Sequence, residues 1–167
     1  MTANDRAKIR SAFRDTAPDL LAYFERRLTD REEAADLLGQ TMLTAWRRVD
    51  KLPADPERQR MWLFVIAANT LSNHRRTWQH RLDLADRLRE HLATTAPAPA
   101  AGEAHAVRDA VLRLRDAQRE LVMLIHWDGF TIVEAAEILG LNASTARSRY
   151  AAAKDALRRA LVEASAG

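Results

Sequence analysis

The sequence predicts an all-α protein made of two small helical domains joined by a flexible linker. Almost every segment of the 167 residues places its apolar side chains at helical spacing, and no segment shows the period-2 alternation typical of a strand. Residues 93–106, ATTAPAPAAGEAHA, are rich in alanine and proline and carry side chains too small to build a core. We therefore expect one domain at residues 1–92, a linker at 93–106 and a second domain at 107–167.

Composition excludes several classes of function. The chain has no cysteine and only five scattered histidines, so neither a disulfide nor a thiolate zinc site is expected, and no metal or other cofactor is predicted. No Gly-rich phosphate loop, HExxH motif or nucleophile elbow is present, so we do not expect an enzyme. The N-terminus is interrupted by charges and no long apolar run occurs, which predicts a cytoplasmic chain with neither an export signal nor a membrane span.

The first domain is expected to contain helices at about 19–28, 30–49 and 61–78. The second of these begins with Asp30 and Glu33, which have the spacing of a capping box. Its apolar repeat places Leu38, Met42, Ala45 and Val49 toward a core. The repeat leaves Asp36, Gly39, Gln40 and Leu43 on another side. Pro53 and Pro56 predict a loop over residues 52–59.

Charge is distributed unevenly within this first domain. The net charge of the whole chain is only +3, but residues 73–81, NHRRTWQHR, carry several arginines around Trp78 and no acid. Residues 30–36 are instead acidic. A basic helix end with an aromatic side chain is suited to binding a nucleic-acid strand.

The second domain shows the spacing of a helix-turn-helix. After a helix expected at 109–126, Thr131 and Glu134 form a second capping box and start a helix that Gly140 ends. Asn142 is a favourable N-cap for the next helix. A helix, a short turn containing glycine and a second helix form the arrangement that many DNA-binding proteins use.

The last helix is predicted to have one core face and one small, basic face. On a helical wheel, Ala146, Tyr150, Ala153 and Leu157 cluster toward the core. The opposite half carries Ser144, Arg147, Ser148, Ala151 and Lys154. Small side chains allow a helix to enter a major groove about 12 Å wide, and arginine can pair with guanine. Arg149 lies at the flank, where it could pair with Glu134, with Glu137 or with a phosphate.

Three motifs in this order resemble the extracytoplasmic-function (ECF) sigma factors of bacterial RNA polymerase, over nearly the whole chain. Residues 33–46, EAADLLGQTMLTAW, resemble the helix of that family that binds core polymerase, and residues 62–76, WLFVIAANTLSNHRR, resemble its promoter −10 helix. The helix-turn-helix at 134–161 resembles the domain that reads the −35 element. The resemblance implies a sigma region 2-like domain followed by a region 4-like domain, a role in promoter recognition, −10 melting and transcription initiation, and no chemistry of its own.

The resemblance also implies partners and contact residues. Core RNA polymerase, promoter DNA and an anti-sigma factor are the expected partners. The residues expected to contact core polymerase are Asp36, Leu37, Gly39, Gln40 and Leu43. Those expected at −10 DNA are Asn69, Asn73, Arg75, Arg76 and Trp78, with residues 52–59 bordering a pocket for a flipped base. Those expected at −35 DNA are Ser144, Thr145, Arg147, Ser148, Arg149, Ala151 and Lys154.

Some residues depart from the family pattern and keep two alternatives open. Gly39 and Gln40 stand where the family usually has glutamine followed by an acid, which predicts weaker binding to core. One alternative is a dimeric helix-turn-helix regulator that reads a palindrome without polymerase. The other is a sigma mimic that binds an anti-sigma factor and never supports transcription.

Overall fold

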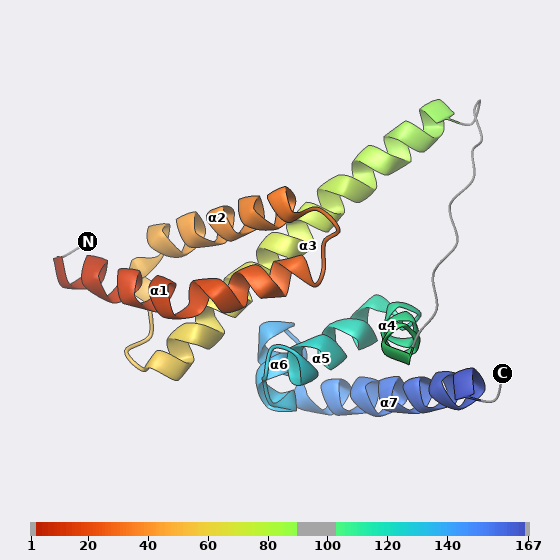
Figure 1. The fold of residues 1–167 in the computed structure, drawn as a ribbon. Coiled ribbons are helices and arrows are strands. Elements are labelled where there is room, and N and C mark those ends of the chain that lie inside the picture. The colour runs from red at the N-terminus through yellow and green to blue at the C-terminus, as the bar shows by residue number, and fades with distance from the viewer. Residues whose placement is uncertain (1–2, 90–102, 166–167) are drawn as a thin grey trace. The chain divides into compact units, whose positions relative to one another are not determined.

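The computed structural model describes residues 3–89 and 103–165. Within these ranges all regular secondary structure is helical, which confirms the predicted fold class. The chain divides into two compact units, residues 1–93 and 94–167 (Figure 1). Most of the predicted linker lies outside the described residues, but its last part, 103–106, is helical. No proline or glycine follows Gly102 there, so nothing in the local sequence prevents the helix from starting at Glu103.

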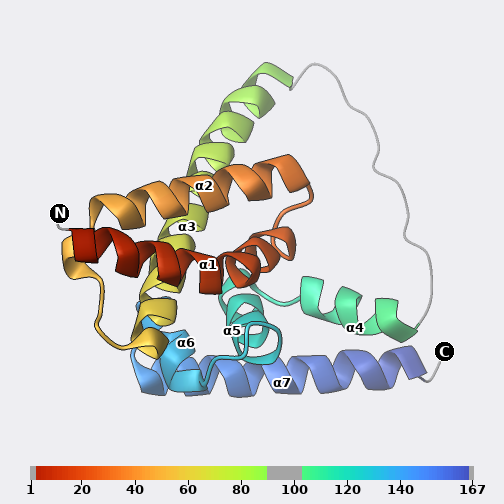
Figure 2. The same cartoon turned by 60° about the vertical axis from the view of Figure 1, so that its left-hand side comes forward.

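The first unit is built from three long helices. α1 (Ala3–Glu25) and α2 (Arg31–Arg47) run antiparallel, and α3 (Pro56–Arg89) packs across both (Figures 1 and 2). A short 3-10 helix, η1 (Val49–Lys51), follows α2. Three aromatic rings at the centre are buried, and Tyr23 meets both Phe24 and Phe64 edge-on at centroid distances of 5.2 and 5.4 Å. This aromatic cluster joins α1 to α3.

α1 begins earlier than the apolar pattern predicts. The sequence places a helix at about 19–28, whereas α1 starts at Ala3 and passes through Pro18 without ending. Pro18 is exposed, and the carbonyl that it deprives of a helical hydrogen bond belongs to Arg14, which is also an exposed residue. Ile9 and Ala12, ahead of the proline, are buried and hold this first part of the helix to the unit.

The ends of α2 and α3 differ from the prediction in two places. Asp30 caps α2 by accepting a hydrogen bond from the Glu32 amide at 2.8 Å, but Glu33 does not complete a capping box because its carboxylate turns toward α3. The loop predicted at 52–59 is shorter, since α3 already begins at Pro56. Proline fits the first turn of a helix, and Asp55 accepts from the Arg58 amide at 2.9 Å.

The buried stripe of α2 is also wider than predicted. Ala45 is buried as expected, but Leu38 and Met42 are only half-buried. Val49 lies beyond the helix, in η1, and is half-buried too. The fully buried positions of α2 are Ala34, Leu37, Thr41 and Ala45. α2 is covered by α1 on one side and α3 on the other, so its core face extends beyond a single apolar stripe.

The second unit is organised around one long helix. α7 (Ala143–Ser165) packs against α4 (Glu103–Leu112), α5 (Asp116–His126) and α6 (Ile132–Ile138) (Figure 2). Its core includes Val111, Leu114, Val122, Met123 and Ala153, with Tyr150 and Leu157 packed at the margin. The predicted core face of the last helix is therefore confirmed.

The helix predicted at 109–126 is divided into α4 and α5. The break falls at residues 113–115, where the Arg119 guanidinium donates to the carbonyl oxygens of Val111, Leu112 and Leu114 at 3.3, 2.6 and 2.9 Å. The last carbonyl groups of a helix lack the partners of a regular turn; here the Val111 oxygen also accepts from the Leu114 amide at 3.2 Å. Arg119 lies in the next helix, only five to eight residues from these carbonyl groups, so the contact is local, but the apolar pattern of 109–126 does not reveal it.

Candidate protein and nucleic-acid interfaces

One face of α2 is exposed and mixed in character. Asp36, Gly39, Gln40 and Leu43 are all exposed, as the wheel predicted. Leu43 is 50% exposed, which is high for a leucine on a packed helix. A Cβ added at Gly39 would meet no atom within 4 Å, so bare backbone lies at the centre of this face. We call Asp36, Gly39, Gln40 and Leu43 the α2 face.

Leu37 does not belong to this surface. It was predicted among the polymerase-contacting residues, but its side chain is only 1% exposed and packs in the core of the first unit. The prediction for Leu37 is therefore wrong as a direct contact. The physical reason is the wide burial of α2, which takes in the position next to Asp36.

The basic part of α3 presents most of its predicted residues to solvent. Asn69, Asn73, Arg76 and Trp78 are exposed, whereas Arg75 is half-buried and already has an interaction within the protein. Asn69, Asn73 and Arg76 are spaced by three or four residues and so lie on neighbouring positions of one side of the helix. The surface offers amides, a guanidinium and an aromatic ring to a ligand.

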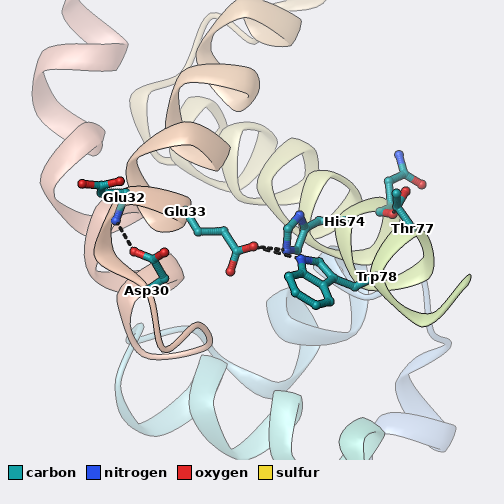
Figure 3. Close-up of polar contacts among 7 residues, drawn as sticks. Asp30, Glu32, Glu33, His74, Thr77 and Trp78 are labelled. Carbon is teal, nitrogen blue, oxygen red and sulfur yellow. Dashed lines mark hydrogen bonds and ion pairs between the residues drawn. The ribbon is translucent and has the colours of Figure 1, made fainter. Parts of the chain in front are cut away.

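The carboxylate of Glu33 on α2 contacts ring nitrogens of two side chains on α3, Trp78 and His74. Glu33 Oε1 lies 3.0 Å from Trp78 Nε1 and 2.9 Å from His74 Nε2 (Figure 3). Trp78 as a whole residue is nevertheless 45% exposed. Glu33 was not predicted as a functional residue, because the local sequence gives it the spacing of a capping-box acid. The only signal in the sequence was the opposite charge of residues 30–36 and 73–81.

A polar groove lies between α2 and α3 beside these contacts. It has a volume of ≈ 480 Å³ and brings Gln40 of the α2 face close to Asn73 and Trp78 of the basic helix. The groove is lined by Glu33, Gln40, Thr44, Thr70, Asn73, His74, Thr77 and Trp78. Two of its hydroxyl groups donate back to their own helix, Thr70 to Ile66 at 2.9 Å and Thr77 to Asn73 at 3.0 Å. The groove therefore connects two surfaces that the sequence predicted separately.

The helix-turn-helix of the second unit is formed as predicted. Thr131 and Glu134 make both hydrogen bonds of a capping box at the start of α6. Gly140 has φ 66°, the left-handed conformation that ends a helix readily only at glycine. Asn142 Oδ1 accepts from the Thr145 amide at 2.8 Å and from the Ser144 hydroxyl at 2.9 Å, which caps α7.

The outer face of α7 is small and basic. Thr145 is half-buried below this face. Of the residues predicted to contact −35 DNA, the others are exposed: Ser144, Arg147, Ser148, Arg149, Ala151 and Lys154. The side chain of Arg149, at the flank of this face, is exposed. Lys154 lies with its Nζ 4.9 Å from the centroid of the Tyr150 ring, which draws that cation toward the protein surface.

The part of the chain that the structure describes contains neither a candidate metal site nor a candidate membrane span. Among the described residues, no three histidine, aspartate or glutamate side chains gather in a way that could hold a metal ion. None of the described helices combines the length and the apolar character that crossing a membrane requires.

Comparisons with known proteins show the family of the chain. The family model of sigma-70 region 2 matches residues 12–81, and that of sigma-70 region 4 matches residues 104–157. The ECF RNA polymerase sigma factor SigC of Mycobacterium tuberculosis is 31% identical over 143 residues, covering 80% of this chain and 73% of SigC. SigL of the same species is 26% identical over 164 residues, covering 96% of this chain and 93% of SigL. The chain belongs to the ECF sigma factors of RNA polymerase.

Solved structures show the same fold. The sigma factor RpoE in complex with the anti-sigma factor NepR from Bartonella quintana superposes with a TM-score of 0.71 at 24% identity, covering 92% of this chain and 96% of that chain. CnrH in complex with the cytosolic domain of CnrY gives a TM-score of 0.65 at 24% identity, covering 95% of this chain and 90% of that chain. At this level of identity the likeness concerns the fold alone.

Proposed function

We propose that this chain binds core RNA polymerase through the α2 face and holds promoter DNA with both units. The observation that carries the proposal is the presence, on one chain, of a region 2 unit with an exposed α2 face and a region 4 unit whose helix-turn-helix exposes a small basic surface. Sigma factors initiate transcription without being enzymes themselves; the polymerase catalyses RNA synthesis.

The first unit, up to residue 92, is assigned to core binding and to the −10 element. Asn69, Asn73, Arg76 and Trp78 supply exposed amides, a cation and a ring, which suit an unpaired strand better than a duplex. Arg75 would contribute from its half-buried position. Residues 52–55, with the first turn of α3, would border the pocket for a flipped base. Leu37 supports the α2 face from inside the core.

The second unit, from residue 107 onward, is assigned to the −35 element. Ser144, Arg147 and Ser148 lie in the first two turns of α7, the part of a recognition helix that reaches base edges. Arg149 and Lys154 lie farther along the exposed side and would contact phosphates, with Ala151 keeping the approach close. Thr145 would hold the start of α7 through its capped amide.

An anti-sigma factor is proposed as the regulator. RpoE and CnrH, the structural neighbours, were solved with an anti-sigma factor and with the cytosolic domain of CnrY respectively. We expect this chain to work in the cytoplasm, where core polymerase and the promoter are found.

Run-off transcription tests the proposal. Core RNA polymerase should produce specific start sites on a genomic DNA library only when this chain is added, and mapping those sites should give a common −10 and −35 pair. Purified chain alone should not protect promoter DNA. A chain that joined core without giving any specific transcript would favour the sigma mimic, and a chain that protected a palindrome without core would favour the dimeric regulator.

A further inference from the structure

One carboxylate oxygen of Glu33 accepts hydrogen bonds from two side chains. His74 and Trp78 stand one helical turn apart on α3, so their ring N–H groups reach the same side of the helix. Glu33 Oε1 accepts from both, at 2.9 and 3.0 Å, across the space between α2 and α3 (Figure 3). The Glu33 and His74 side chains are only 26% and 19% exposed, so the contact between them lies partly out of water, where a hydrogen bond to a carboxylate is stronger than at an open surface. The hydrogen bond from Trp78 lies at the exposed edge of this contact.

This contact limits the orientations of the Trp78 ring. The bond from Nε1 fixes one edge of the indole against α2, while 45% of the residue remains exposed. Asn73 and Thr77 line the groove beside the ring. The ring is therefore held in place before any ligand arrives, with much of its surface still accessible for stacking.

We infer that Glu33 is a positioning residue for the −10 DNA surface, holding Trp78 so that an unpaired base can stack on it. This inference rests on the proposed function, because it takes Trp78 as a DNA contact. Ordering a free side chain on binding costs roughly 0.5–1.5 kcal/mol, equivalent to about 2- to 12-fold in affinity, and a ring that is already held avoids much of that cost.

The same contact joins the two proposed interfaces. Glu33 and Asp36 are three residues apart on α2, and Gln40 lines the same groove as Trp78. The helix proposed to bind core polymerase thus also fixes a ring proposed to bind DNA. Glu33 is not among the four residues of the α2 face, but it lies beside them on α2, so the affinity of each variant for core is measured before DNA binding is compared.

The first test follows the indole directly in the full-length chain, without polymerase or DNA. Glu33→Ala removes the acceptor, and Glu33→Gln keeps an oxygen in the same place. Glu32→Ala is the matched control, an exposed acid at the neighbouring position of the same helix. The NMR signal of the Trp78 indole N–H should exchange with water faster in Glu33→Ala than in the parent, and at the parental rate in Glu32→Ala. An exchange rate that Glu33→Ala left unchanged would overturn the inference.

The second test measures function in the holoenzyme. The probe is a fluorescein-labelled single-stranded oligonucleotide carrying the −10 sequence mapped by run-off transcription. Glu33→Ala should bind it about 2- to 12-fold more weakly than the parent at equal affinity for core, and Glu33→Gln should recover part of the loss. Glu32→Ala should match the parent.

A double variant separates positioning from a general structural effect. Trp78→Phe keeps a ring but removes the N–H, so Glu33→Ala should cause little further loss of oligonucleotide binding in that background. An equal loss in both backgrounds would show that Glu33 acts by another route and would overturn the inference. A parent holoenzyme that bound no −10 strand would instead refute the proposed function, while the indole measurement would still report whether Glu33 holds the ring.

Discussion

The guanidinium of Arg119 caps the C-terminal end of the preceding helix, with its Nη2 atom 2.6 Å from the carbonyl oxygen of Leu112. The same side chain reaches Val111 and Leu114 and forms an ion pair with Asp116 at 3.2 Å. One side chain of α5 thereby fixes where α4 ends. The helix that lies against α7 in the region 4 unit thus owes its boundary to a contact from outside it.

Arg119→Ala should therefore loosen α4. Removing a charged donor from carbonyl groups lowers the free energy of unfolding by about 1–3 kcal/mol. The lower end of this range applies here because Arg119 is partly exposed. Hydrogen exchange of the α4 amides in the full-length chain should become faster, while the amides of α2 stay protected. Arg115→Ala is the control, since that exposed arginine makes no side-chain cap at the start of α5. Equal protection of α4 in both variants would contradict the assigned role.

Gly39 and Gly140 should respond to alanine in opposite directions. Gly39 lies inside α2 with open space around it, so Gly39→Ala should raise the free energy of unfolding by about 0.5–1 kcal/mol through helix propensity. Gly140 also has open space, but its φ of +66° strains any L side chain. Gly140→Ala should therefore lower the free energy of unfolding by about 1–2 kcal/mol. Urea denaturation monitored by circular dichroism measures both, and shifts of the same sign would refute this account.

Asp36→Ala should weaken binding to core polymerase without affecting folding. Asp36 is exposed, so its removal opens no cavity, and the loss of an exposed charge contact costs roughly 1 kcal/mol, about fivefold in affinity. Fluorescence titration of labelled chain with core measures the change. Asp50→Ala, at an exposed acid in η1, serves as the control. Identical affinities for the Asp36 variant and the parent would show that the α2 face is not the interface.

Arg147→Ala should reduce recognition of the −35 element. If Arg147 pairs with a base, its loss should weaken holoenzyme binding by about 1–3 kcal/mol and relax the preference at one position of the site. Binding to a set of −35 duplexes that differ at single positions gives the measurement. Arg158→Ala is the control, because Arg158 lies far along α7 and pairs with Asp155 at 3.1 Å. A uniform loss over all duplexes would reassign Arg147 to a phosphate.

The parts of the fold that sequence reasoning predicted correctly have local causes. Thr131 bonds Glu134 three residues later, and Asn142 caps the helix that starts at the next residue. The exposed sides of α2 and α7 follow from helical periodicity, which is again local. The errors occurred where a proline or a neighbouring helix changed the outcome, as at Pro18, at Pro56 and at the buried Leu37.

By itself, the sequence determined that the chain is helical, where its helix-turn-helix lies and which sides of α2 and α7 face solvent, because capping and periodicity act over a few residues. Only the tertiary structure decided that the Glu33 carboxylate contacts His74 and Trp78, 41 and 45 positions farther along the chain, instead of completing the capping box of α2. Contacts of this kind depend on which surfaces meet when the helices pack, and no pattern within either segment specifies that meeting.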